Sequence, residues 1–323
     1  APGIAAWGGG RGGAHAVAAW RGGRGGAGAL GGAAVPLGVL ADAAFGDPRR
    51  GHPVAGFGRL AGAFERVAYR PTRLAGAVYA AVLVGVTAGA AALLERALPK
   101  TLVRAVCLWA ALGGRSLARE AEAVGGLVER GDLDGARVRI RSLVGRDPEA
   151  LDATELSRAV IESVAENTVD AVIAPLVWTA VAGAPGVVAY RAVNTLDAMV
   201  GNRSDRYARF GTASARADDV MNWPAARLAA ALTVLLSGRP AATWRAWRDD
   251  APKHPSPNAG QIEAAFAGAL GLTLGGTLAY RGRVEHRPQL GTGRDPRPAD
   301  IARAVRLARR ISLATAALTW RFA

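Results

Sequence analysis

Two long stretches without charged residues most constrain how this chain can fold. Residues 74–94 form an uncharged, mostly apolar run of 21, and residues 171–190 form a run of 20. A helix needs about 20 apolar residues to cross the hydrocarbon core of a bilayer. Residues 74–94 are the stronger candidate because they lack proline and are flanked by Arg73 and Glu95. The two runs predict helices that either span a membrane or fill a large core.

The second long run contains several residues that interrupt helices, namely Pro175, Gly183, Pro185 and Gly186. Membrane helices tolerate such breaks when neighbouring helices satisfy the freed backbone groups. A membrane helix over residues 171–190 is therefore still compatible with the sequence.

Four further uncharged runs have 17, 17, 11 and 10 residues and comprise residues 25–41, 264–280, 228–238 and 311–320. Runs of this length are more often buried or interfacial. Alternation of apolar and polar residues does not persist beyond a few positions, so we predict no sheet. The predicted fold class is all-α: a polytopic integral membrane helical bundle with polar amphipathic helices between the spans. The alternative is a large soluble all-α protein in which alanine-rich runs are buried.

Composition adds domain limits and excludes some partners. Residues 1–28 are rich in Gly, Ala and Arg without periodicity, which predicts a low-complexity, disordered segment before a single domain at 29–323. The net charge of +14 suits nucleic acid, an anionic membrane or phosphorylated ligands. No zinc-ligand spacing, RNA-binding box or basic helix with heptads accompanies it, so no nucleic-acid partner is predicted. The single cysteine excludes an internal disulfide and any CxxC metal site.

An acidic file precedes the second long run, in the stretch ESVAENTVD. Glu162, Glu166 and Asp170 are four residues apart each time, which places them on one face of a helix. Acidic residues in a row on one face of a helix commonly face solvent. In this arginine-rich chain, however, no basic residue occurs between Arg158 and Arg191. Acids without local counter-ions favour an external cation such as Mg²⁺, which prefers carboxylate oxygens and water.

Two later stretches repeat this pattern of acids and amides. In NTLDAMVG and ARADDVMNWPAAR, the residues concerned are Asn194, Asp197, Asp218, Asp219 and Asn222, followed by Arg227. Paired acids with an amide at helical spacing can hold a magnesium ion bound to phosphate, while arginine takes phosphate oxygens. Helix capping explains many such pairs, so each is weak evidence alone.

Two proline-containing loops carry the remaining polar candidates. The stretch DAAFGDPRRGHPV presents Asp42, Asp47 and His52 after an apolar run, and taken alone it reads as a loop with a capping aspartate. The stretch KHPSPNAGQIEAAFAGALGLTLGG begins with a loop and leads into a predicted glycine-rich apolar helix suited to close packing. Its polar residues are Lys253, His254, Ser256 and Asn258.

Together and in this order, the stretches GDPRRGHPV, ESVAENTVDAVIAPL, NTLDAMVG, ARADDVMNWPAARL and HPSPNAGQIEAAFAGALGLTLGG, followed by RPQLG, closely resemble the CobD/CbiB family of cobalamin biosynthesis. The resemblance covers residues 39–307. It implies a multi-pass protein of the inner, cytoplasmic membrane in contact with lipid. It also implies ATP- and Mg²⁺-dependent amide ligation of a corrinoid substrate, adenosylcobyric acid, with (R)-1-aminopropan-2-ol or its O-phosphate. Contacts with other late cobalamin-pathway membrane enzymes are compatible with this role.

We assign roles to the motif residues as a hypothesis that rests on this resemblance. The predicted metal cluster comprises Glu162, Glu166, Asp170, Asp218 and Asp219. The predicted substrate- and phosphate-binding residues are Asn167, Asn194, Asp197, Asn222, Arg227, Lys253, Ser256 and Asn258. The predicted catalytic residues are His52 or His254 as base, Asp47 to orient one of them, and Glu166. The sequence has no P-loop, so ATP would bind in another geometry.

Two other functions remain open at this point. A different Mg²⁺-dependent membrane transferase would need two aspartate-rich D-x-x-D boxes, and only DDVMN approaches one. A non-catalytic corrinoid-binding or transport protein would be expected to have more evenly spaced, full-length spans. The ligase fits the ordered motifs better than either alternative.

Overall fold

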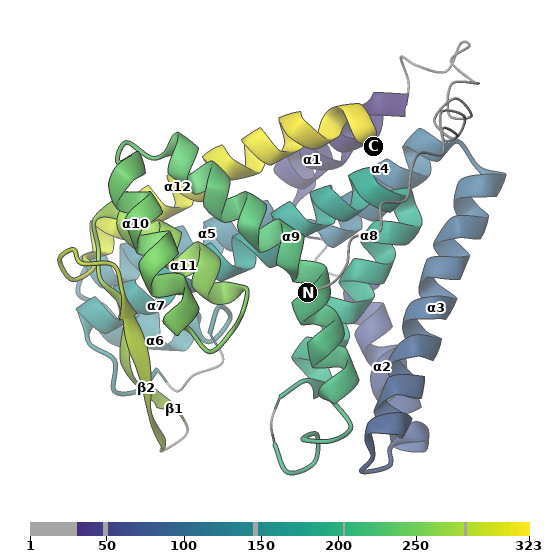
Figure 1. Ribbon diagram of the computed structural model, residues 1–323, viewed down its shortest axis with the longest axis horizontal. Coiled ribbons are helices and arrows are strands. Elements are labelled where there is room, and N and C mark those ends of the chain that lie inside the picture. Colours follow the sequence, from purple (N-terminus) through teal and green to yellow (C-terminus); the bar gives the residue numbers. More distant parts are fainter. Residues whose placement is uncertain (1–30, 48–50, 145–147, 203, 281–282) are drawn as a thin grey trace, which may run out of the picture.

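The computed structural model describes residues 31–47, 51–144, 148–202, 204–280 and 283–323, and it is nearly all helical (Figure 1). The predicted low-complexity segment 1–28 lies outside these residues. The longer helices are α1 (Ala34–Phe45), α2 (Pro53–Ala68), α3 (Arg73–Ala97), α4 (Lys100–Ala111), α5 (Gly114–Glu129), α6 (Leu133–Ile140), α7 (Ala153–Thr168), α8 (Ala174–Val200), α9 (Thr212–Leu236), α10 (Pro240–Asp250), α11 (Ala259–Leu270) and α12 (Pro298–Thr319). The short turns are η2 (Gly31–Ala33), η3 (Val169–Ile173), η4 (Ala251–Lys253) and η5 (Trp320–Phe322).

The helices form two groups that α9 connects. On the right of Figure 1, α2 and α3 pack against α8, and on the left α5, α6, α7, α10 and α11 lie together. Helix α9 packs on α8 at one end and on α10 and α11 at the other, while α12 runs across the top against α5 and α7. The largest core cluster lies in the left group and includes fully buried Leu156, Ile161, Ile262 and Phe266. The connection through α9 places polar residues of both groups side by side.

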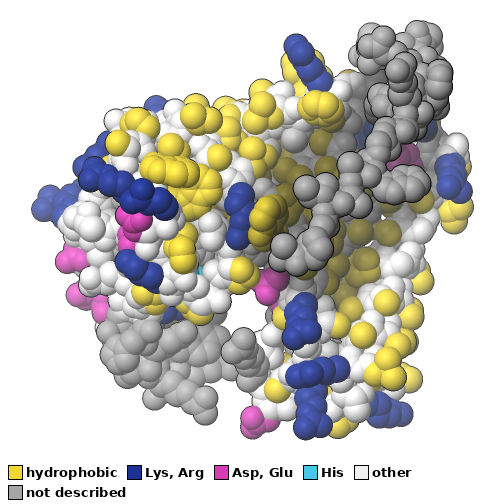
Figure 2. All heavy atoms as spheres, viewed as in Figure 1, with side chains coloured by type: hydrophobic (Ala, Val, Ile, Leu, Met, Phe, Trp, Pro, Cys, Tyr) yellow, Lys and Arg dark blue, Asp and Glu magenta, His cyan; other side chains and the backbone are white. Residues whose placement is uncertain are grey.

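Two helices of the described residues are long and apolar enough to cross a membrane. The first is α3, which matches the predicted run 74–94, and only 17% of its most apolar window is buried. Its exposed side chains include Leu74, Val78, Val82, Val86 and Leu93. Figure 2 shows hydrophobic side chains along this edge of the molecule. The second is the continuous segment Ala153–Val200, whose window is 56% buried. By length and composition the described part of the chain thus supplies two candidate spans.

The segment Ala153–Val200 changes helical geometry twice. At η3 (Val169–Ile173) it forms a π-helical turn, in which one extra residue is accommodated. At Ala182 and Gly183 the backbone leaves helical angles, and Gly183 has a φ of 62° that favours glycine. The second change lies among the helix-interrupting residues noted in the sequence. The first places Asp170 in an unusual turn.

The prediction that the fold has no sheet is wrong in one place. An antiparallel hairpin joins β1 (Leu274–Tyr280) to β2 (Arg283–Leu290), with Leu274 paired to Leu290. The glycine-rich apolar helix predicted over this region ends early, because α11 stops at Leu270 with Gly271 in the left-handed conformation. Gly275 and Gly276 also have positive φ, which a right-handed helix cannot accommodate.

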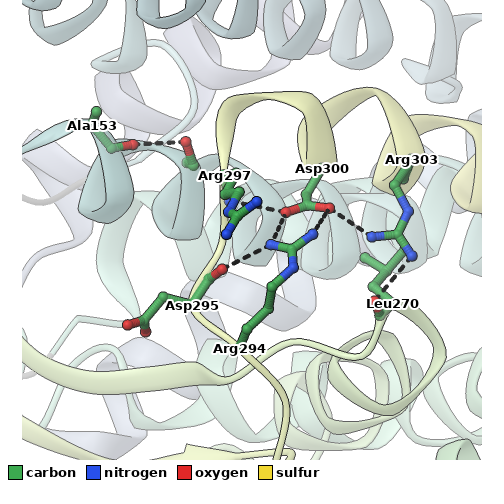
Figure 3. A network of polar contacts seen from close by, with 8 residues as sticks. Ala153, Leu270, Arg294, Asp295, Arg297, Asp300 and Arg303 are labelled. Carbon is green, nitrogen blue, oxygen red and sulfur yellow. Dashed lines mark hydrogen bonds and ion pairs between the residues drawn. The ribbon is translucent and has the colours of Figure 1, made fainter.

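A buried carboxylate fixes the start of α12 (Figure 3). Asp300, 1% exposed, accepts two hydrogen bonds from Arg294 at 2.7 and 2.9 Å and one from Arg303 at 2.6 Å. The backbone N–H of Arg297 donates a fourth at 2.9 Å. Burial alone would raise the pKa of Asp300, but these hydrogen bonds outweigh it and hold the pKa below its ordinary value.

Replacing Asp300 with asparagine is expected to lower the free energy of unfolding by about 3 kcal/mol, because the buried position then loses the charge that Arg294, Arg303 and the Arg297 N–H hydrogen-bond. A depressed folded-state pKa stabilises the fold above the unfolded pKa of about 3.9, and the effect disappears as pH falls through the folded value. Thermal unfolding in detergent should therefore show a difference at pH 7 that shrinks toward pH 3. Asp295→Asn is the control: its side chain is 71% exposed, and the change should cost less than about 1 kcal/mol.

Candidate functional site

An acidic pocket lies where the two groups of helices meet. This cavity of about 140 Å³ is lined by five carboxylates, namely Glu166, Asp170, Asp197, Asp218 and Asp219. Asn222, Ser256 and Asn258 supply further polar groups, and Val169, Ala259 and Ile262 complete the wall. Residues from four of the predicted stretches, far apart in sequence, therefore line one pocket, which we call the acid pocket.

Helical spacing on three segments builds this pocket. Glu166 lies in the last turn of α7, and Asp170, in the π turn that follows, lines the same cavity. Helix α8 contributes Asp197, and α9 contributes the adjacent acids Asp218 and Asp219. Residues four apart lie one turn apart on the same helical face. For this reason the four-residue spacing read from the sequence brings Glu166 and Asp170 together despite the change to π geometry.

Two asparagines hold the carboxylates in place. Nδ2 of Asn194 donates to Asp170 Oδ2 at 3.3 Å and to Asp218 Oδ1 at 3.2 Å. Nδ2 of Asn222 donates to Asp218 Oδ2 at 3.0 Å, and its Oδ1 accepts from the Tyr190 hydroxyl at 2.9 Å. Both oxygens of Asp218 thus accept an amide hydrogen bond. Amide donors allow two carboxylates to lie close without a cation between them, although they do not cancel the charge.

The pKa values of the α9 acids reflect this crowding. Burial raises the pKa of Asp218, the hydrogen bonds from Asn194 and Asn222 lower it, and the charge of Asp219 raises it again, so that the net shift is upward. Burial also raises the pKa of Asp219. Upward shifts mean that the pocket disfavours a full set of negative charges. A bound cation would relieve this cost.

The donor set of the acid pocket fits a hydrated Mg²⁺ ion. Magnesium prefers carboxylate and amide oxygens and usually keeps several waters, taking one or two protein carboxylates together with substrate phosphates. Within the described residues, no three acidic, histidine or cysteine side chains are placed to ligate one ion. A Mg²⁺ ion in this pocket would take one or two of these carboxylates and complete its coordination with water and phosphate oxygens.

The loop before α11 covers one side of the pocket, and Arg227 holds it there. Arg227 Nη1 donates to Asn258 Oδ1 at 2.8 Å, and Nη2 donates to the Pro257 carbonyl at 3.1 Å. Asn258 Nδ2 in turn donates to the carbonyl of Asp219 at 2.8 Å. Burial lowers the pKa of Arg227. Arg227 therefore positions the loop. Its predicted contact with phosphate stays a prediction.

The two predicted histidines lie outside the pocket wall. His52 caps α2 by accepting from the Val54 N–H, and its Nε2 is 3.7 Å from Asp47 Oδ1. The predicted pairing of Asp47 with a histidine is thus present, at a distance longer than a hydrogen bond. His254 is buried, accepts from the Ser256 N–H at 3.0 Å and has Nε2 3.7 Å from Glu263. Its ring thus packs beneath the loop that bears Ser256.

Three other predicted residues lie away from the acid pocket. Glu162 Oε1 accepts from the Gly275 N–H at 2.8 Å and anchors the hairpin. Asn167 donates back to the Ser163 carbonyl on its own helix at 2.9 Å. Lys253 pairs with Asp250 at 2.7 Å. Each has a local structural contact, and the pocket wall does not include them.

Sequence reasoning overlooked Tyr190 and Arg191. Tyr190 donates to both the Asp170 carbonyl at 3.1 Å and Asn222. Arg191 Nη1 donates to Asn194 Oδ1 at 3.2 Å and so fixes which end of that amide faces the acids. The signal was present: Tyr190, Asn194 and Asp197 recur at four- and three-residue spacing on one face of α8.

Fold and site together define a class: a nearly all-α protein with two helices of membrane-spanning length and a pocket of carboxylates and amides between its helical groups. A sequence model of the family described as CobD/Cbib protein matches residues 35–308. The chain belongs to the CobD/CbiB family, as its motifs predicted.

Relatives of this family share most of their length with the chain. A cobalamin biosynthesis protein CobD of Mycobacterium tuberculosis is 50% identical over 292 residues, which cover 88% of this chain and 93% of the relative. Proteins of the same name from Chromobacterium violaceum and Rhodobacter capsulatus are 48% and 43% identical, covering 85% and 81% of this chain and 91% and 86% of their own lengths. No solved structure matches the chain.

Proposed function

We propose that this protein is a cobalamin-biosynthetic enzyme of the cell membrane that joins the propionate carboxylate of adenosylcobyric acid to (R)-1-aminopropan-2-ol or its O-phosphate. Membership of a family whose relatives are named cobalamin biosynthesis proteins supports the pathway. The observation that carries the site is the acid pocket, where five carboxylates and two bridging asparagines meet.

The reaction needs activation of a carboxylate, which is a poor electrophile. In the proposed sequence, a carboxylate oxygen of the substrate takes the γ-phosphoryl group of ATP, giving an acyl phosphate and ADP. The amine nitrogen then attacks the carbonyl carbon, inorganic phosphate leaves, and the nitrogen loses a proton. The product is an amide, with the phosphoryl group of ATP released as phosphate.

Residues of the acid pocket would bind and orient the phosphates. Bound Mg²⁺ would neutralise phosphate charge, and Asp170 and Asp218, which Asn194 holds together, are the residues we propose to hold it. Asn222 and Asn194 keep the carboxylates oriented through the hydrogen bonds described above. Ser256 and Asn258 also line the pocket, and their hydroxyl and amide groups would contact phosphate oxygens.

The proton of the attacking amine needs an acceptor near the pocket. Glu166 lines the cavity and is exposed, which makes it the proposed base. The Asp47–His52 pair is the second candidate. Asp47 lies beside Gly113, and the Gly113 N–H donates to the carbonyl of Ala171 at 3.1 Å. Ala171 directly follows Asp170, so the pair is connected to the pocket through this contact.

The direct test is an assay of the purified full-length protein with adenosylcobyric acid, aminopropanol phosphate and Mg²⁺–ATP. Formation of the amide together with stoichiometric ADP and phosphate is expected, and no product when ATP or Mg²⁺ is omitted. A parallel reaction with free aminopropanol identifies the preferred amine. A folded sample that binds the corrinoid but forms no ATP-dependent amide would overturn the ligase assignment in favour of a non-catalytic binding protein.

Magnesium affinity is expected to fall as pH falls, because the ion competes with protons for Asp218. The raised pKa of Asp218 means that it protonates earlier than an ordinary aspartate as pH falls, and a protonated carboxyl does not bind the ion. The Mg²⁺ concentration for half-maximal thermal stabilisation should rise as the pH is lowered from 8 to 5.5, by up to about tenfold per pH unit for each proton displaced. In Asp218→Asn the slope should be smaller. An equal half-saturating Mg²⁺ concentration at pH 8 and pH 5.5 would argue against Asp218 as a ligand.

A further inference from the structure

A second, larger cavity lies on the other side of the segment of α7 and the π turn that contributes Glu166 and Asp170 to the acid pocket. It measures about 520 Å³ and is enclosed by α1, α5, α7, α8 and α12, with the π turn between α7 and α8 in its wall. Its volume falls within the range of sites for small organic ligands. None of the residues assigned to the proposed reaction lines it. We call it the arginine-rimmed cavity.

The wall of this cavity is mainly apolar. It includes Val164, Leu176 and Val305, all buried, together with Leu112 and Val172. An apolar wall of this extent offers little to a water-soluble, amide-rich molecule such as a corrinoid. It favours a hydrocarbon group, because burying apolar surface contributes about 25 cal/mol for each Å² removed from water.

Three arginines lie in the lining of this apolar cavity. Arg115 and Arg119 are one turn apart on α5, and Arg309 comes from α12. The side chains of Arg119 and Arg309 are 60% and 58% exposed, so their guanidinium groups are accessible at the mouth. The acids of the lining are Asp42 and Glu122, and Glu122 is 2.9 Å from Arg309. Arg119 Nε lies 3.7 Å from Glu120 Oε1, outside the lining. The lining itself has three arginines against two acids, and this excess of positive charge complements an anionic group.

The residues around the mouth connect the cavity to an exposed apolar surface. Leu313 lines the cavity and is itself 64% exposed. Leu40 on α1, next to the lining residue Val39, is equally exposed, and Leu318 and Trp320 are further exposed apolar residues toward the end of α12. Exposed apolar patches of this kind mark sites of contact with lipid or protein. A ligand can thus reach the cavity from an apolar phase.

We propose that the arginine-rimmed cavity binds an anionic phospholipid, with one acyl chain inside and the phosphate on Arg119 and Arg309. A basic rim at the mouth of an apolar pocket between helices is the arrangement that recognises anionic head groups. Arg115, which donates to the carbonyls of Ala43 and Ala44, adds positive charge from behind the rim.

Such a lipid would contact the segment that carries the catalytic acids. Thr168 and Val172 face the arginine-rimmed cavity, while Val169 and Asp170 face the acid pocket. An acyl chain packed against Val172 would therefore support the π turn from behind. The lipid would act as a structural partner of the acid pocket; this consequence for activity rests on the proposed function, whereas lipid binding does not.

Lipid binding is tested by native mass spectrometry of the detergent-purified full chain with phosphatidylglycerol or phosphatidylcholine. We expect phosphatidylglycerol to bind at least about tenfold more tightly, since basic side chains near a head group favour an anionic lipid. The double variant Arg119→Gln/Arg309→Gln should remove this preference. Arg310→Gln is the matched control, because this neighbouring exposed arginine lines a different cavity and should leave binding unchanged.

A second variant tests the acyl chain separately. Ser312, a partly buried lining residue, replaced by tryptophan should fill the cavity and weaken both lipids. Equal binding of the two lipids, or unchanged phosphatidylglycerol binding in the double variant, would refute the proposal. Displacement of the lipid by millimolar inorganic phosphate would instead indicate a site for free phosphate and would also refute it. These readouts need no turnover, so they are independent of the amide ligation.

Discussion

Asp170→Asn and Asp218→Asn are each expected to lower kcat for ATP-dependent amide formation by about a hundred- to a thousandfold, the range seen when one element of charge stabilisation is removed from an active site. Each change keeps the shape of the side chain and removes one negative charge from the acid pocket. Asp218 accepts amide hydrogen bonds on both oxygens, so asparagine there also meets Nδ2 of Asn194 or Asn222 with a donor of its own. Amide formation and the Mg²⁺-dependent rise in melting temperature are measured together.

Stability in the absence of Mg²⁺ separates loss of the site from misfolding. Because the folded pKa of Asp218 is raised, its ionised form costs stability at neutral pH, and this cost appears as pH rises above the unfolded value. Asp218→Asn removes this cost but brings its amide donor against Nδ2 of Asn194 or Asn222, so the two effects oppose each other and the melting temperature without Mg²⁺ should stay within about 4 °C of the parent value. Asp249→Asn on α10 is the control, since this half-exposed side chain pairs only with neighbouring Arg248 among the described residues, and its kcat should stay within about twofold. Near-normal turnover in either pocket variant would remove that residue from the proposed metal site.

Local spacing in the sequence predicted the acid pocket well because helices preserve it. Four acids predicted to bind metal, Glu166, Asp170, Asp218 and Asp219, line one cavity. The same argument misplaced Glu162, which lies on the same stripe one turn earlier. A helix rises about 5.4 Å per turn, so one turn is enough to move a side chain out of a small pocket. Periodicity indicates the face of a helix but not the position along it at which a neighbour packs.

Features that depend on distant parts of the chain were not predictable in this way. The hairpin β1–β2 follows an apolar stretch that reads as helix, and only the positive φ values of Gly271, Gly275 and Gly276 in the folded chain end that helix. His254 and Lys253 lie next to a loop whose direction is set by the hydrogen bond from Arg227, on a different helix, to Asn258 of the loop. His254 was predicted to be a base and Lys253 to bind phosphate, whereas the loop turns them toward Glu263 and Asp250.

The second large loss of activity is expected from a substitution on α8, at Asn194. Asn194 is the only described side chain whose amide nitrogen donates to both Asp170 and Asp218, and Arg191 holds the carbonyl end of that amide away from them. Asn194→Asp would remove both hydrogen bonds and place a third carboxylate between two others. Like charges at this distance disfavour ionisation and push the side chains apart. We expect kcat to fall by about a hundredfold or more, since small displacements of positioning groups cost this much.

The stability of the same variant identifies the cause. Without Mg²⁺, Asn194→Asp should unfold at a lower temperature than the parent protein, and the difference should grow from pH 5 to pH 8 as the added carboxyl ionises. Mg²⁺ should narrow the difference, because a cation offsets the extra charge. Asn202→Asp is the matched control: Asn202 is exposed beyond the end of α8 and accepts from the Ser204 N–H at 3.2 Å, a bond that aspartate keeps. A pH-independent loss of stability in Asn194→Asp would mean that the amide serves packing alone, and that the two carboxylates do not need a donor between them.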